Sequence, residues 1–302
     1  MYYFLCNPTA GGGRAKETIA ALEAHLKAEG LEYEIGISTY HKHAIELVRD
    51  AVARGYRHIF TLGGDGTNFE AVNGLAAAGL PEEVSIGFLP GGTGNDFTRH
   101  FNLPRDPIAA FDSLRRGPAR MLDVWKANDL YFINVFGLGL DVDLGDWAMR
   151  TKKLLSGMPA YVAALLLTLV GFRFKKIRLT VGDRVLEREL VVLTASNGRY
   201  YGGGILVAPQ AQVSDGLLDL VFISRVAKVK IPMLLMKYIA GRHIAEVPQC
   251  EHLQVDRFVV ESDQPLLCET DGEIQLTAPV TIERAQKGIM VMVGEDFEGE
   301  EH

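Results

Sequence analysis

The first hundred residues contain three glycine-rich segments, and each of them directly follows a short apolar run. The segments are Asn7–Gly13, Gly63–Thr67 and Pro90–Phe97. An amphipathic stretch with helical spacing comes after each one, so strands and helices alternate along this part of the chain. Such alternation predicts an α/β fold in which helices cover both faces of a parallel sheet. Because ligands bind at the carboxyl ends of parallel strands, we expect the three segments to share one site.

The predicted elements divide the chain into two domains. The strands expected in the first domain are Tyr2–Cys6, Tyr33–Ser38, His58–Leu62 and Val84–Leu89, with helices over about 14–29, 42–54 and 67–77 and from about 95. After about Leu122 the pattern becomes rich in Val, Ile, Leu and Phe, and the expected strands are Tyr131–Gly137, Lys176–Val181, Glu189–Ala195, Leu217–Ser224, Gln254–Glu261 and Val280–Glu283. This half predicts a mostly antiparallel β-sandwich with helical insertions over Asp141–Phe172 and Lys228–Ala240. We therefore expect domains over 1–122 and 123–287, with a last strand within about 288–302 returning to the first domain.

Composition excludes several classes of protein. The formal net charge is −7, which argues against a nucleic-acid binder. Cys6, Cys250 and Cys268 are widely separated, so they predict neither a zinc site nor a disulfide framework, and they fit a reducing cytoplasm. The longest apolar stretch, Met158–Phe172, is shorter than the ~20 residues that cross a bilayer. The first residues lack the basic region of a signal peptide, so we expect a cytoplasmic protein.

The glycine-rich segments carry the chemistry of phosphate binding. Glycine allows a ligand to approach the main chain closely, and the N–H groups at the start of the following helix attract anions. Thr67 and Thr93 add hydroxyl groups at two of those helix starts. The chain has no G-x-x-x-x-G-K-[ST] and no G-x-G-x-x-G that opens a helix after a strand. The segments therefore predict a nucleotide site that is neither a P-loop nor a Rossmann site.

Three motifs resemble one branch of a known group of kinases. Gly63-Gly64-Asp65-Gly66-Thr67 is similar to the GGDGT signature of diacylglycerol, sphingosine and NAD kinases, and to the GGDG of phosphofructokinases. Asn7-Pro8-x-x-Gly11 and Gly92-Thr93-Gly94-Asn95-Asp96-Phe97 resemble the lipid-kinase branch, because NAD kinases lack the second of them. Asn197–Gly204, Asp215-Gly216 and Asp271-Gly272-Glu273 resemble the same branch. The resemblance runs from Asn7 to Glu273 and is strongest to the soluble bacterial diacylglycerol kinases and related lipid kinases.

The resemblance implies a set of site residues by matching position. ATP would be surrounded by Asn7, Pro8, Thr9, Ala10, Gly11, Thr39, Gly63, Gly64, Asp65, Gly66, Thr67, Asn68, Glu70 and Thr93. The general base and its acidic partner would be Asp271 and Glu273, in an order that the residues leave open. Mg²⁺ would be held by Gln212, Asp215 and Leu217, with Gln212 and Leu217 acting through main-chain oxygens, and a second Mg²⁺ would accompany ATP. The family commonly has an apolar residue and then Asn before the Glu, whereas here Asn68 stands one position early.

Three of the acidic residues have structural alternatives. Asp65 lies between glycines, where a bare carboxylate would repel phosphate, so a metal-linked or loop-fixing role is expected. Asp96 is expected to cap the helix that follows the third segment. The Asp-Gly pair at 271–272 is also a strong signal for a simple hairpin turn.

The resemblance implies an ATP-dependent lipid kinase whose best acceptor is diacylglycerol and whose product is phosphatidic acid. A kinase for a sphingoid base, another lipid alcohol or NAD remains an alternative, as does a non-catalytic nucleotide-binding regulator. Expected partners are the lipid, a membrane surface touched transiently at the inner face, and a second copy of the chain. Two stretches could meet the membrane: Met158–Phe172 with its flanking lysines, and Lys228–Arg242. The first of them could instead be a core helix of the second domain.

Overall fold

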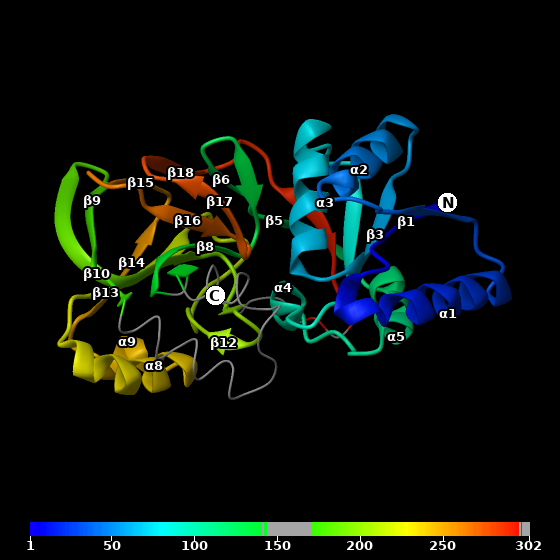
Figure 1. Ribbon diagram of the computed structural model, residues 1–302. Coiled ribbons are helices and arrows are strands. Elements are labelled where there is room, and N and C mark those ends of the chain that lie inside the picture. The colour runs from blue at the N-terminus through cyan, green and yellow to red at the C-terminus, as the bar shows by residue number, and fades with distance from the viewer. Residues whose placement is uncertain (141, 144–170, 296, 298–302) are drawn as a thin grey trace.

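The structure is a computed structural model that describes residues 1–140, 142–143, 171–295 and 297. The described residues form two large sheets, one covered by helices and one with few helices against it, and a small two-stranded sheet. Figure 1 shows the helix-wrapped part on the right and the β-rich part on the left. The expected combination of an α/β part and an antiparallel β part is therefore confirmed.

The first sheet has the order β2-β1-β3-β4-β19-β5, and all neighbours pair in parallel except β19 and β5. Its strands are β1 (Tyr2–Cys6), β2 (Tyr33–Ile37), β3 (His58–Gly63), β4 (Ser85–Pro90), β5 (Ala119–Leu122) and β19 (Ile289–Met292). The last described strand, β19, lies between β4 and β5. The carboxyl ends of β1, β3 and β4 are adjacent, which brings the three glycine-rich segments to one edge of the sheet.

Helices cover both faces of this sheet, so the inner strands β1, β3 and β4 are buried along most of their length. The helices of this part are η1 (Ala10–Gly13), α1 (Ala15–Ala28), α2 (His43–Ala53), α3 (Asp65–Ala77), α4 (Asp96–Arg99) and α5 (Pro107–Arg116). On one face α1 and α5 bury an aromatic cluster in which Phe4 and Phe60 stack and Phe111 meets both edge-on. On the other face α2 and α3 pack side by side over residues such as Val48 and Val72.

The second sheet is antiparallel and strongly curled. Its strands are β6 (Trp125–Ala127), β7 (Leu130–Phe132), β8 (Val135–Gly139), β9 (Lys175–Val181), β10 (Arg184–Ser196), β13 (Leu218–Ser224), β14 (Cys250–Val255), β15 (Arg257–Glu261), β16 (Leu267–Thr270), β17 (Glu273–Thr277) and β18 (Val280–Arg284). The long strand β10 pairs with β9 along its first half and with β8 and β13 along its second half. Its inner face buries a second core around Trp125 and Phe136.

The remaining described elements lie at one end of the curled sheet. They are the two-residue strands β11 (Tyr200–Tyr201) and β12 (Ile205–Leu206), and the helices η2 (Lys228–Lys230), α8 (Ile231–Ile239) and α9 (His243–Glu246). The helix expected over Lys228–Ala240 corresponds to η2 and α8. The other expected insertion, Asp141–Phe172, falls almost entirely outside the described residues, as does the apolar stretch Met158–Phe172. Among the helices that the structure describes, none is both long and apolar enough to span a bilayer.

Two predicted strands were wrong, because the chain breaks within each of them. The stretch Tyr131–Gly137 was expected to be a single strand, but β7 ends at Phe132 and β8 begins at Val135. The stretch Gln254–Glu261 was expected to be a single strand, but β14 ends at Val255 and β15 begins at Arg257. Asp256 stands between them, and aspartate is depleted in strands. The break changes the pairing partner, because β14 pairs with β13 whereas β15 pairs with β9 and β18.

Candidate active site

The three glycine-rich segments enclose a polar cavity of about 490 Å³ at the carboxyl edge of the first sheet. Most of the residues expected around ATP line it, namely Asn7, Thr9, Ala10, Gly11, Thr39, Gly64, Gly66, Thr67, Glu70 and Thr93. Four others from that set, Pro8, Gly63, Asp65 and Asn68, lie outside its lining. Gly92 of the third glycine-rich segment and Glu273, which was expected at the reacting centre, also line it, together with Ser38, Tyr40 and His41, which the sequence did not indicate.

Hydrogen bonds tie the first two glycine-rich segments together. The Asn7 side-chain amide donates to the Thr67 hydroxyl over 3.1 Å, and its oxygen accepts from both the main chain and the hydroxyl of Thr9. Asn68 lies deeper, where its side-chain oxygen accepts a 2.7 Å hydrogen bond from the Thr61 hydroxyl, and only 3% of it is exposed. Asn68, which stands one position earlier than the asparagine common in the family, is therefore buried in the core of the α/β part.

The second and third segments approach each other so closely that only glycine fits. A Cβ atom added to Gly92 would lie 2.4 Å from the Cα atom of Gly64. The side chain of Asn95 fixes the third segment, because it accepts from the Gly92 N–H and donates to the Gly92 carbonyl. The cavity wall is therefore exposed backbone, which suits the binding of phosphate groups.

Glu70 has a structural role at the edge of this cavity. Its carboxylate accepts hydrogen bonds from the main-chain N–H groups of Lys42 and Ala44, at 2.8 and 3.1 Å, where α2 begins. It also lies 3.4 Å from the Nδ1 atom of His41. An acidic group at a helix start satisfies N–H groups that have no partner within the helix. Glu70 thereby holds the loop of Thr39, Tyr40 and His41 against the cavity.

We expect Glu70→Ala to lower the free energy of unfolding by about 1–2 kcal/mol, because two N–H groups lose a charged acceptor. Urea denaturation followed by circular dichroism measures this. The control is Glu17→Ala, since Glu17 lies exposed in the first turn of α1. We expect that control to change the free energy by no more than about 0.5 kcal/mol. Equal effects of the two substitutions would contradict the capping role.

A second cavity, of about 420 Å³, lies between the glycine-rich edge and the β-rich part. One end of it is apolar and is lined by Leu140, which follows β8, and by side chains from β8, β10, β12 and α8, among them Val135, Val191, Val192, Ile205 and Leu234. The other end is acidic and is lined by Asp65, Asp96, Glu269 and Asp271. Sequence reasoning missed this cavity, because its walls come from segments far apart in the chain.

The turn Asp271-Gly272-Glu273 connects the two cavities. Asp271 and Gly272 line the apolar cavity, whereas Glu273 lines the polar one. A Cβ atom added to Gly66 would lie 2.9 Å from the Glu273 Oε1 atom, so this carboxylate touches the second glycine-rich segment. The chain passes through the turn with Asp271 at a φ of 49° and Gly272 at 86°.

The Asp271 carboxylate faces main-chain N–H groups. Its Oδ1 atom accepts from Asn134 and Val135 at 2.9 Å each, and its Oδ2 atom accepts from Ile133 at 3.0 Å. Burial raises the pKa of Asp271 to about 6, while these three N–H groups act in the opposite direction. The residue therefore anchors the start of β8 to the turn that carries Glu273.

Asp65 and Asp96 connect the glycine-rich segments to the β-rich part. The Asp65 Oδ1 atom accepts a 2.8 Å hydrogen bond from the Asp96 main chain, and the Asp96 Oδ2 atom accepts one of 2.8 Å from the Gly203 N–H. Burial raises the pKa of both carboxyl groups. The cap expected from Asp96 was wrong, because its side chain caps no N–H group of α4 and bonds to the loop after β11. Asp65 fixes a loop, which is one of the two roles expected for it.

The residues expected to hold Mg²⁺ lie elsewhere. Gln212, Asp215 and Leu217 precede β13 and line neither cavity. The Asp215 carboxylate accepts from the Leu217 N–H at 2.9 Å, and Asp123 accepts from the Gly216 N–H at 2.7 Å. Over the ranges given above, no three His, Cys, Asp or Glu residues form a group suited to a metal ion.

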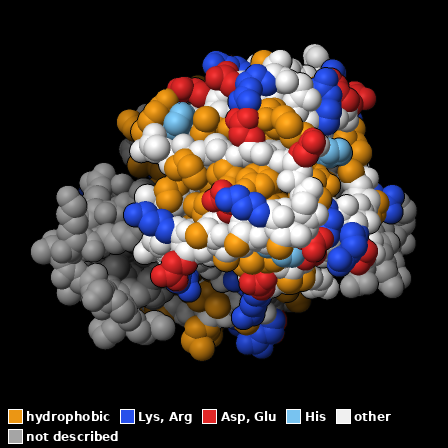
Figure 2. Space-filling view, turned by 90° about the vertical axis from the view of Figure 1, so that its right-hand side faces the viewer, with side chains coloured by type: hydrophobic (Ala, Val, Ile, Leu, Met, Phe, Trp, Pro, Cys, Tyr) orange, Lys and Arg blue, Asp and Glu red, His pale blue; other side chains and the backbone are white. Residues whose placement is uncertain are grey.

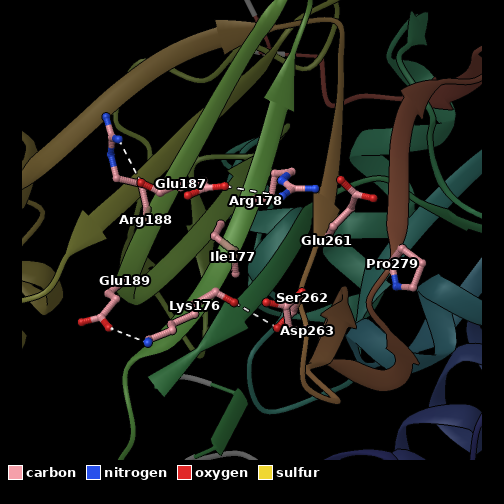
Figure 3. A pocket seen from close by; sticks show the side chains of 10 residues that line it. All are labelled: Lys176, Ile177, Arg178, Glu187, Arg188, Glu189, Glu261, Ser262, Asp263 and Pro279. Carbon is pink, nitrogen blue, oxygen red and sulfur yellow. Dashed lines mark hydrogen bonds and ion pairs between the residues drawn. The ribbon is translucent and has the colours of Figure 1, made fainter.

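A further hollow lies on the outer surface of β9, β10 and β15, and Figure 3 shows its lining. Its charged side chains pair with one another or with neighbours: Lys176 with Glu189, Arg178 with Glu187, and Arg188 with Glu251. None of the expected site residues lies there. Figure 2 shows that the face of the α/β part has both signs of charge interspersed, so this face offers no extended basic surface to a nucleic acid.

Comparisons with known proteins identify the family to which the chain is similar. Residues 1–127 match the family model described as the diacylglycerol kinase catalytic domain, and residues 134–293 match the YegS C-terminal NAD kinase beta sandwich-like domain. A diacylglycerol kinase of Bacillus subtilis is 27% identical over 268 residues, which cover 88% of each chain. A Staphylococcus aureus protein named "putative lipid kinase" is 28% identical over 294 residues, covering 97% of this chain and 94% of the other.

A solved structure has the same fold over almost its whole length. The crystal structure titled as that of a "putative diacylglycerol kinase" from Bacillus anthracis superimposes with a TM-score of 0.79. It is 25% identical in sequence, and the match covers 98% of this chain and 96% of that one.

Proposed function

Because the chain belongs to the family that joins a diacylglycerol kinase catalytic domain to a YegS C-terminal NAD kinase beta sandwich-like domain, we propose that it phosphorylates a lipid hydroxyl with ATP. The acceptor proposed is diacylglycerol and the product phosphatidic acid. One observation carries the proposal: a polar cavity walled by glycine backbone meets an apolar cavity at a turn that carries two carboxylates. ATP suits the first cavity and an acyl chain suits the second.

The transfer exchanges one bond to phosphorus for another. The lipid hydroxyl oxygen bonds to the γ-phosphorus of ATP, the bond from that phosphorus to the bridging oxygen breaks, and ADP leaves. The hydroxyl proton passes to a carboxylate. Positioning and charge stabilisation dominate such reactions, so the main task of the glycine-rich segments is to hold the phosphates in place.

Glu273 is the proposed proton acceptor and Asp271 a positioning residue. The Glu273 carboxylate lies beside Gly66 at the wall of the polar cavity, within the region where the γ-phosphate would stand. The two oxygens of Asp271 already accept three main-chain hydrogen bonds, which leaves them poorly placed to receive a proton from a substrate. Holding β8 and the turn in register is the role that these bonds support.

The proposal includes Mg²⁺ at the loop of Gln212, Asp215 and Leu217. The metal ligands proposed there are the Asp215 carboxylate and main-chain oxygens, and the Asp123 carboxylate also contacts this loop. All of these ligand atoms are oxygens, which Mg²⁺ prefers. An ion in this loop would fix its conformation at the start of β13. A Mg²⁺ ion accompanying ATP would neutralise phosphate charge during transfer.

The test is incubation of the purified protein with γ-labelled ATP, Mg²⁺ and separate acceptors in mixed micelles: diacylglycerol, monoacylglycerol, phosphatidylglycerol, sphingosine, ceramide and NAD. Label in diacylglycerol that is lost with Glu273→Gln is the expected result. Label in NAD alone would overturn the lipid assignment. ATP binding without label in any acceptor would favour a non-catalytic regulator.

A further inference from the structure

The outer face of η2 and α8 is apolar although it faces solvent. Val229, Met233, Met236 and Ile239 are 85%, 56%, 72% and 54% exposed. Their spacing of four, three and three residues places them on one side of the helical segment. The opposite side of α8 packs into the molecule through Ile231, Leu234 and Tyr238, which are buried. We call the four exposed residues the α8 outer face.

The α8 outer face lies directly over the apolar cavity. Leu234, Leu235, Tyr238 and Ile239 all line that cavity, so α8 is a wall between the cavity and the outside. Figure 1 shows α8 at the margin of the β-rich part, away from the helices of the α/β part. An exposed apolar surface next to an apolar cavity marks a place where a hydrophobic partner is met.

The charges next to this face favour an anionic partner. Lys228 and Lys230 are exposed at its amino end, and neither has an ion-pair partner among the described residues. At its carboxyl end Lys237 and Arg242 share Glu246 at 3.4 and 3.1 Å. Basic residues beside exposed apolar ones are the pattern of a helix that lies in the interface of an anionic bilayer.

We infer that the α8 outer face docks on an anionic lipid bilayer, with the helix lying in the headgroup layer. This orientation places the apolar cavity next to the bilayer, with α8 between them, so that a lipid has only a short path from the bilayer to the Asp271–Glu273 turn. The inference rests on the proposed function for its substrate, but the docking itself does not require turnover. The alternative occupant, a second copy of the chain, is an outcome of the test.

The test is cosedimentation of the full chain, without ATP, with vesicles of phosphatidylglycerol and phosphatidylcholine. The double variant Met233→Glu/Met236→Glu should lower the vesicle partition coefficient at least tenfold. The matched control is Met121→Glu/Val185→Glu, which adds the same charge at residues that are 43% and 57% exposed elsewhere. The control should partition like the parent. Unchanged partition of the α8 variant, an equal loss in the control, or no binding by the parent would overturn the inference.

A second variant tests the basic residues without adding acidic ones. Lys228→Gln/Lys230→Gln should reduce the increase in binding that follows a rise in the phosphatidylglycerol fraction. If this dependence is unchanged, the anionic surface is not the partner. Sedimentation velocity tests whether a second copy of the chain covers this face instead. If the parent is a dimer and Met233→Glu/Met236→Glu makes it a monomer, membrane docking is overturned.

Activity on short-chain diacylglycerol, dissolved as monomers, separates this inference from the proposed function. The α8 variant should phosphorylate the dissolved acceptor like the parent but lose at least tenfold in rate on long-chain diacylglycerol in vesicles. An equal loss of rate on both acceptors would mean that α8 serves only as a wall of the cavity, and it would overturn docking. If the parent phosphorylates neither acceptor, the proposed function fails, whereas the vesicle partition still decides whether the face docks.

Discussion

Glu273→Gln should lower kcat for lipid phosphorylation by about 10²- to 10⁴-fold, the range in which a positioned proton acceptor contributes. Glutamine keeps the size of the side chain but removes the charge that receives the hydroxyl proton. Because the substitution leaves the glycine-rich segments intact, the affinity for ATP should change little. Steady-state rates with a saturating acceptor, together with calorimetric titration of ATP, measure both quantities.

The comparison variant is Asp271→Asn, which keeps a side chain that tolerates the φ of 49° at this position. If Asp271 holds β8 and the turn in register, this variant should lose stability to urea and raise the KM for the lipid, with a smaller loss in kcat. If only Asp271→Asn causes a severe loss of kcat, Asp271 is the proton acceptor and Glu273 the positioning residue. Such a result would mean that the three N–H groups tune Asp271 as the base.

Gly92→Ala should weaken ATP binding by about 10- to 100-fold. The added methyl group would stand 2.4 Å from the Gly64 Cα atom, and neither partner is a flexible side chain. The second and third glycine-rich segments must separate, and overpacking of this kind costs about 1–3 kcal/mol. The control is Gly171→Ala, because a Cβ atom there would meet nothing within 4 Å. ATP affinity is measured by calorimetric titration. Equal affinities of Gly92→Ala and the parent would contradict the close packing of Gly92 against Gly64.

Most of the helix-wrapped sheet could be predicted from the sequence because its strands carry local signals, although the edge strand β5 was not expected. The apolar runs before Gly63 and Pro90 end in glycines, and a helical pattern follows each. The strand break at Asp256 was missed because a single polar residue does not show that the chain leaves one partner strand for another. Strand pairing is a tertiary property, so spacing alone does not contain it.

The candidate site was predictable in its polar half and not in its apolar half. The residues that face the polar cavity follow strand ends in short motifs, which are readable one at a time. The apolar cavity needs β8, β10 and α8 to meet, and nothing in the sequence near Val135 indicates Leu234 as a neighbour. Side-chain roles across long separations were hidden in the same way: Glu70 bonds to main chain 28 residues away and Asp96 to main chain 107 residues away.

The position of β19 has a consequence for how the chain folds during synthesis. This strand comes from residues 289–292, yet it fills the place between β4 and β5 in the sheet that begins at residue 2. During synthesis the whole β-rich part is made before β19, so the first sheet is still incomplete when that part has left the ribosome. Until β19 is in place, β4 presents an unpaired edge, which is the kind of surface that invites pairing with another chain. Nascent chains stalled before residue 289 should therefore depend on chaperones more than the finished protein does.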